Sequence, residues 1–209
     1  MGKKIFAVTA TLTFAFGILF LSILRSAAVK YDFLASPLPT EIDGKVEEVD
    51  AVEINYYLPS PGSVLPNHPL WPLKALRDKL WLLVTSDPAK DAELNLLFAD
   101  KRIASAYILF QKGSPEVGFT TLTKAEKYLE AASSQEEDLR KAGLNTQEFA
   151  ERLVNASLKH QQIIREILLI APDDAKSLIA KTEDYPHRVY TTKLEVIKNY
   201  GRPVIENPF

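Results

Sequence analysis

The sequence predicts an all-α fold with an N-terminal transmembrane helix, an extended linker and an antiparallel bundle of about five helices. An uncharged apolar run near the N-terminus predicts the membrane span. Apolar residues then recur at steps of three and four from about residue 67 onward, which is the period of helices with one buried face. Proline or glycine separates these periodic segments, and the connections are short, as is typical of antiparallel neighbours in a bundle.

These patterns divide the chain into five parts. We predict a cytoplasmic n-region at residues 1–4, a transmembrane signal-anchor at 5–24, an extended acidic and Pro-rich linker at 25–66, a helical bundle domain at 67–202 and a tail at 203–209. No repeat of fixed period and no low-complexity block is present. The helical bundle is therefore expected to be the only folded domain.

The apolar run from Ile5 to Leu24 has the length of a membrane span, because at about 1.5 Å per residue it extends about 30 Å. A cleaved signal peptide, with its cleavage site at 26–28, is the alternative. Signal peptides have shorter apolar regions of about 7–15 residues, and Arg25 also favours retention. Both interpretations export the remainder of the chain. We expect a single-pass cell-membrane protein with an extracytoplasmic C-terminal domain, or a secreted protein if the segment is cleaved.

The linker contains an acidic stretch at residues 41–53, which predicts a solvated spacer, with cation binding as the alternative. At its C-terminal side, an alternation has the two-residue period of an extended strand. Val52, Ile54, Tyr56 and Leu58 alternate there with Glu53, Asn55 and Tyr57. No second strand pattern lies nearby. We therefore expect a lone extended segment that packs on the helices.

The expected helices occupy residues 68–85, 88–112, 115–142, 146–170 and a shorter segment from Asp173 that Pro186 interrupts. Asn67 is expected to cap the first helix and Asp87 the second, followed by Pro88 at the first helical position. Each helix has an apolar seam that we expect to face the core. In the first helix the seam is Leu73, Leu76, Leu80 and Leu83; in the second it is Ala89, Ala92, Leu96, Ala99, Ile103, Ala106 and Phe110.

Several motifs in fixed order resemble a bacterial family classed as a domain of unknown function. They are PG at 61–62, LP at 65–66, PLK at 72–74, SDP at 86–88 and ADKR at 99–102, and the resemblance covers the chain from Leu58 to Ala132. It implies an all-helical domain on exported or membrane-anchored bacterial proteins. It implies no activity, substrate, cofactor or catalytic residue.

Charged residues beside the seams predict a structural network that pairs neighbouring helices and sets their register, with ligand binding as the alternative. Its members are Arg77, Asp78, Asp100, Lys101, Arg102, Lys124 and Glu126. His160 falls in the seam of the fourth helix, where a single histidine is more often a hydrogen-bonded core residue than a ligand. Trp71, Trp81 and His160 are assigned to a candidate interaction surface.

The composition excludes several classes of chemistry. Cysteine is absent, so the chain has no disulfide, thiolate metal site or cysteine nucleophile. No HExxH, GxSxG, P-loop or GxGxxG motif occurs, and the net charge of −2 gives no basis for binding nucleic acid. We therefore predict no cofactor, no metal residue and no catalytic residue.

The predicted function is a membrane-anchored, extracytoplasmic helical interaction or structural module that has a protein partner and is not an enzyme. One alternative is a small-ligand sensor domain that binds between helices, with a polar pocket near His160 or Asp100. The other is a cell-envelope enzyme, which needs a cleft with converging carboxylates, one of them with a raised pKa.

Overall fold

A computed structural model describes residues 11, 13–14, 17, 33, 54–203 and 206–209. The chain divides into two compact units, residues 1–32 and residues 33–209. The predicted n-region and most of the predicted linker and membrane span lie outside the described residues. Where the structure describes the chain, no helix is both long enough and apolar enough to cross a bilayer.

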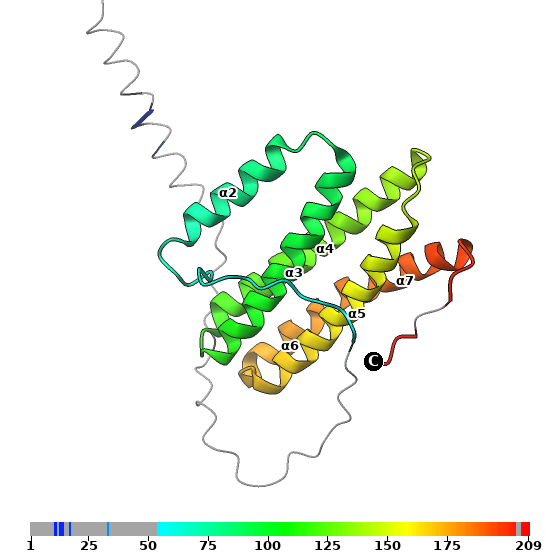
Figure 1. The fold of residues 1–209 in the computed structure, drawn as a ribbon. Coiled ribbons are helices and arrows are strands. Elements are labelled where there is room, and N and C mark those ends of the chain that lie inside the picture. The colour runs from blue at the N-terminus through cyan, green and yellow to red at the C-terminus, as the bar shows by residue number, and fades with distance from the viewer. Residues whose placement is uncertain (1–10, 12, 15–16, 18–32, 34–53, 204–205) are drawn as a thin grey trace, which may run out of the picture. The chain divides into compact units, whose positions relative to one another are not determined.

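The second unit is helical, as the sequence predicts (Figure 1). Its helices are α2 (Trp71–Val84), α3 (Pro88–Gln111), α4 (Pro115–Lys141), α5 (Gln147–Ile170), α6 (Asp173–Thr182) and α7 (Asp184–Asn199), and the described residues contain no strand. The most extensive packing joins α3 to α4, and α5 packs against α7 and α3. The all-α prediction is confirmed.

Glycines end two of the long helices, as predicted. Gly113 follows α3 with a φ of 68° and Gly143 follows α4 with a φ of 85°, a left-handed conformation that residues with a Cβ rarely adopt. The N–H of Ser114 reaches back to the carbonyl of Leu109, and that of Leu144 to the carbonyl of Leu139. These bonds satisfy carbonyls at the helix ends and reverse the chain direction within a few residues.

Of the two predicted N-terminal capping residues, Asp87 is confirmed and Asn67 is wrong. Asp87 caps α3 by accepting a 3.0 Å hydrogen bond from the N–H of Ala89. Asn67, in contrast, does not cap α2, which begins four residues later at Trp71 with Leu70 in the cap position. The intervening residues form turns instead, because Pro69 disfavours α geometry at His68, the first position of the expected helix.

The break near the C-terminus also differs from the prediction. We expected Pro186 to interrupt a helix, but the chain breaks at Glu183, and Pro186 lies in the first turn of α7. Proline is tolerated there because the first N–H groups of a helix have no intrahelical partner. The segment expected as one interrupted helix is therefore α6 followed by α7.

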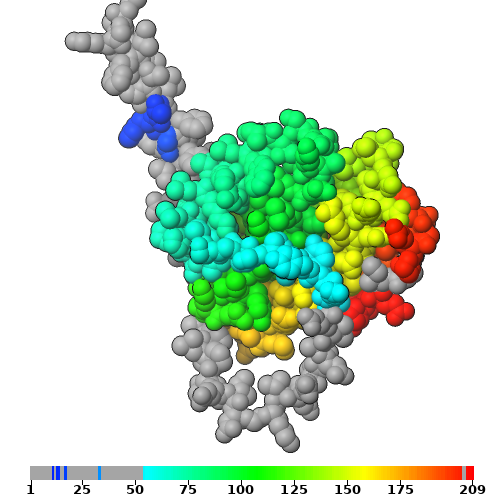
Figure 2. Space-filling view, viewed as in Figure 1, coloured from blue at the N-terminus to red at the C-terminus, as the bar shows by residue number. Residues whose placement is uncertain are grey.

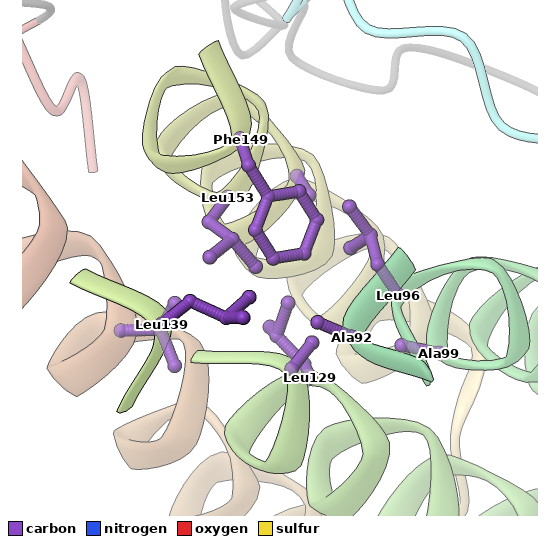
Figure 3. Close-up of a cluster of buried hydrophobic side chains, with 10 residues drawn as sticks. Ala92, Leu96, Ala99, Leu129, Leu139, Phe149 and Leu153 are labelled. Carbon is purple, nitrogen blue, oxygen red and sulfur yellow. The ribbon is translucent and has the colours of Figure 1, made fainter. Parts of the chain in front are cut away.

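The core lies between α3, α4 and α5 (Figure 3). The predicted seam of α3 is buried from Ala92 to Phe110, although its first residue, Ala89, is exposed. The labelled core residues are Ala92, Leu96 and Ala99 of α3, Leu129 and Leu139 of α4, and Phe149 and Leu153 of α5. The small residues of α3 and Gly118 of α4 allow close approach, and a Cβ at Gly118 would lie 2.9 Å from the ring of Phe110.

The chain before α2 packs on this core. Residues 54–62 form no helix or strand, and Ile54, Tyr56 and Leu58 are half-buried whereas Asn55 and Tyr57 are exposed, in agreement with the predicted alternation. The N–H of Ile54 donates to Oε1 of Gln162 on α5 at 3.0 Å. Farther back, the ring of Phe33 lies edge-on to that of Phe119 on α4, with centroids 5.7 Å apart.

Candidate functional site

The His160 cluster is a group of buried polar side chains that joins α3, α4 and α5. His160 Nδ1 lies 2.9 Å from Oε1 of Glu126, and its Nε2 lies 3.2 Å from Oδ1 of Asp100. The hydroxyl of Tyr56 donates to the other oxygen of Asp100 at 2.8 Å. His160 and Glu126 have no exposed surface, and Asp100 is 4% exposed. His160 and Glu126 are therefore enclosed in this conformation, whereas Tyr56 at the edge of the cluster is only half-buried.

The two carboxylates determine the charge of His160. Burial opposes the charged form of the ring, but the negative charge of Glu126 and the hydrogen bonds to Asp100 and Glu126 outweigh it and raise the pKa of His160 to about 9. The imidazolium present at neutral pH donates from both ring nitrogens. Burial and the Asp100 carboxylate raise the pKa of Tyr56, so its hydroxyl remains a donor. The second oxygen of Glu126, Oε2, has no hydrogen-bond partner among the described residues.

A second group of charges attaches α2 to the bundle. Asp78 is the one buried residue of α2, and it pairs with Arg77 at 2.7 Å and with Arg102 of α3 at 3.9 Å. The guanidinium of Arg102 lies over the rings of Tyr128 and Phe98, at 4.3 and 5.3 Å from their centroids. Burial lowers the pKa of Arg102, but arginine stays protonated in proteins. This buried charged pair is therefore one of the contacts between α2 and α3, beside the edge-on contact of Trp81 with Phe98.

A third group joins α4 to α7, and sequence reasoning missed it. Lys193 of α7 is fully buried, with its Nζ 2.5 Å from Oε2 of Glu136 on α4. The hydroxyl of Thr146 donates to the other oxygen of Glu136, also at 2.5 Å. A signal existed in the sequence, because Glu136 falls between Ala132 and Leu139 in the seam period of α4. A charge at a seam position indicates a buried partner on a facing helix.

The leucine seam of α2 was expected in the core, and that prediction is wrong. Leu73 is 66% exposed, Leu80 49% and Leu83 80%. The reason is Asp78, which faces the bundle and lies about 200° around the helix from Leu80. We define the α2 apolar face as Leu73, Leu76, Leu80, Leu83 and Val84. In the space-filling view, α2 lies at the surface of the second unit (Figure 2).

The profile of one protein family, described as Domain of unknown function (DUF5667), matches residues 63–174 of the chain. The chain belongs to this family. The match begins before α2 and ends within α6, so the family domain includes α2 to α5, Asp100, Glu126 and His160. Tyr56 and Lys193 lie outside it. No curated protein and no solved structure matches the chain. The expected resemblance to a domain of unknown function is confirmed, although the match runs to residue 174, beyond the expected end at Ala132. The motifs and the implied export or anchoring stay predictions.

Within the family domain, the structure divides the predicted charge network into two groups. Asp100 and Glu126 pair with His160, whereas Arg77, Asp78 and Arg102 pair with one another. Lys101 and Lys124 take part in none of these pairs. The side chain of Lys124 reaches the exposed side of α4, where partial desolvation and the charge of Arg102 lower its pKa.

The predicted interaction surface is also divided. His160 is buried in the core and cannot belong to a surface in this conformation. Trp81 is 48% exposed, with its ring edge-on to Phe98 at 6.4 Å between centroids. Trp71 is half-buried beside Lys74, whose Nζ lies 5.1 Å from the ring centroid. At about 100° per residue, Trp71 lies on the Asp78 side of α2, opposite the apolar face, and Trp81 lies about 120° from the centre of that face.

Three cavities lie at one end of the family domain, with volumes of about 380, 440 and 420 Å³. The first two are lined by the start of α3 and by residues around the connection from α4 to α5. The third is lined by the end of α2, by α3 and by Arg152 of α5. Neither His160 nor Asp100 lines any of the three. The polar pocket that the sensor alternative places near these residues is not one of these cavities.

Proposed function

We propose that this chain is a membrane-anchored, extracytoplasmic helical module that works by presenting the α2 apolar face to a partner, without cofactor or turnover. One observation carries the proposal: an apolar helix face with leucines up to 80% exposed lies on the same unit as a closely packed core. Exposed contiguous apolar surface on a soluble domain typically marks an interaction site.

The buried charges support the same conclusion, because they have structural partners. Asp100, Glu126 and His160 come from three different helices, and their pairing fixes the register of α3, α4 and α5. Lys193 and Glu136 fix α7 on α4 in the same way. Removing one member of such a pair leaves an uncompensated buried charge, which is strongly destabilising. These groups therefore hold a rigid scaffold on which α2 is presented.

The anchoring part of the proposal is supported by the uncharged run from Ile5 to Leu24 and by Lys3 and Lys4 before it. Positive charge before the first span favours a cytoplasmic N-terminus, which places the helical unit on the outer side of the membrane.

Fractionation of cells that express the full chain tests this part. The protein is expected to stay with membranes after an alkaline wash, to have an intact mass that includes residues 5–24, and to lose its helical unit to protease added outside spheroplasts. A mature chain that starts near Val29 would contradict the anchor. Protection of the helical unit from external protease would contradict its extracytoplasmic location.

A ligand screen tests the absence of a cofactor. Metal ions, nucleotides or haem added to the purified chain are expected to leave the melting temperature unchanged, because a ligand selective for the folded state raises it by mass action. A saturable rise that His160→Gln abolishes would favour the sensor alternative.

A further inference from the structure

The α2 apolar face is bordered on both sides by positive charge. At about 100° per residue, Arg77 and Lys79 lie about 80° to either side of the centre of the leucine stripe. The side chain of Arg77 is 63% exposed, and Lys79 is also exposed. The acidic residue of α2, Asp78, is buried and pairs with Arg77 and Arg102, so its single negative charge offsets only part of the positive charge of these two arginines.

Further basic residues from the neighbouring helices surround α2. Burial lowers the pKa of Lys124 on α4, and the positive charges of Arg102, Lys79 and Lys127 lower it further. The pKa of Lys74 is lowered by burial, raised by the carboxylate of Asp78, and lowered again by the positive charges of Arg77 and Lys101. The exposed members of this group are Arg77, Lys79, Lys124 and Lys127. The chain as a whole has a net charge of −2, so the positive charge is a local property of this side of the domain.

The charges decide between two occupants of the face. A second copy that paired through the same leucine stripe would bring Arg77 and Lys79 against their counterparts, and like charges at such positions repel. An anionic bilayer surface provides the opposite charge for the lysines and an apolar layer for the leucines. Amphipathic helices with a leucine face bordered by lysine and arginine bind in the plane of such interfaces.

The chain length also permits this contact. The bundle unit begins at Phe33, which packs on Phe119 of α4 and donates its N–H to Glu116 at 3.3 Å. Residues 25–32 separate Phe33 from the predicted end of the membrane span. Even fully extended, a connection of this length reaches only about 30 Å. A domain attached so closely meets its own bilayer far more often than any partner in solution.

We propose that the α2 apolar face and its bordering basic residues dock on the surface of an anionic lipid bilayer. The leucine side chains enter the boundary between headgroups and acyl chains, and Arg77, Lys79, Lys124 and Lys127 contact lipid phosphates. The inference rests on the proposed function for the tether, and it names the partner that the proposed function leaves open.

A fluorophore on α2 tests the docking in the full chain reconstituted into vesicles. The chain has no cysteine, so Leu83→Cys provides a single thiol for an environment-sensitive label. Leu169→Cys on α5 is the matched control, because Leu83 and Leu169 are 80% and 81% exposed. In vesicles of phosphatidylcholine mixed with phosphatidylglycerol, the label at 83 is expected to shift to the blue and to be quenched by brominated lipid. The label at 169 is expected to do neither.

Charge and salt provide a second measurement that does not alter the leucines. Lys79→Gln is expected to lower the equilibrium constant for docking about fivefold, since one basic residue near an anionic surface contributes about 1 kcal/mol. Lys198→Gln, an exposed lysine of α7, serves as the control and is expected to have no effect. High salt or pure phosphatidylcholine is expected to release the label at position 83.

The result can separate this inference from the proposed anchor. Flotation with pure phosphatidylcholine vesicles in high salt reports the anchor alone. A chain that fails to float there refutes the anchor, and its docking is then measured by adding anionic vesicles at low salt. Equal emission of the labels at 83 and 169 on anionic vesicles would overturn the docking. A disulfide that joins two copies of the unlabelled Leu83→Cys variant would also overturn the docking, because it would assign the α2 apolar face to a second copy of the chain.

Discussion

Helices α2 and α3 have the same apolar period but lie in opposite environments. Leu73, Leu76, Leu80 and Leu83 of α2 follow steps of three and four, as do Ala99, Ile103 and Ala106 of α3. The α3 residues have no exposed surface, whereas Leu83 is 80% exposed. The difference shows that a period identifies a face of a helix but does not say what that face contacts. The side of α2 that faces the bundle is identified by Asp78.

The largest effect is expected from the buried ion pair of α7. Replacing Lys193 with Met leaves Glu136 buried without its main counter-charge, and the free energy of unfolding is expected to fall by about 3–5 kcal/mol. The exposed Lys198→Met on the same helix is the control and should change it by less than about 0.5 kcal/mol. Urea unfolding measures both. Equal effects would show that Lys193 is not buried in solution.

Next comes the seam of α3. Ile103 has no exposed surface, so Ile103→Ala is expected to lower the free energy of unfolding by about 2–5 kcal/mol through lost burial and the cavity that remains. Glu116→Ala, outside the seam, is expected to cost less than about 0.5 kcal/mol. Chemical denaturation again provides the comparison, and similar losses for the two variants would mean that the assigned face of α3 is wrong.

The pH dependence of stability tests the His160 cluster. The pKa of His160 is raised to about 9 in the folded state, above its unfolded value of about 6.5. Its contribution to stability is therefore complete below about pH 6.5 and is lost as the pH rises through about 9. His160→Gln, which also removes the ion pairs, is expected to be less stable and to lack this slope. The difference between wild type and variant, followed by thermal unfolding from pH 6 to 10, isolates the histidine. A constant difference would contradict the imidazolium.

Much of this fold could be predicted because its signals are local. Asp87 before Pro88 begins a helix and Gly113 ends one, and both signals act through the backbone of adjacent residues. The start of α2 was harder, because Pro69 disfavours helical geometry directly after the candidate cap at Asn67, and the helix begins at Trp71 instead. The break at Glu183 has no proline or glycine to mark it.

The candidate site was predicted only in part, because its contacts are long-range. Asp100 and Glu126 could be assigned to a charge network, but their partner His160 is 60 and 34 positions away in the chain. The sequence places His160 on the apolar seam of α5, but it does not say which residues of the other helices lie opposite His160. The sequence of α2 contains its leucine stripe and its basic borders, yet which side faces the bundle depends on Arg102 of α3.

The smallest expected effect tests the central claim most directly. If the α2 apolar face is presented to a partner rather than packed in the core, a charge there should be harmless to the isolated fold. Leu83→Glu in the purified chain, measured by urea unfolding in detergent, is expected to stay within about 0.5 kcal/mol of wild type, as surface substitutions usually do. A loss above about 2 kcal/mol would show that Leu83 is buried in the folded protein. The α2 face would then belong to the core.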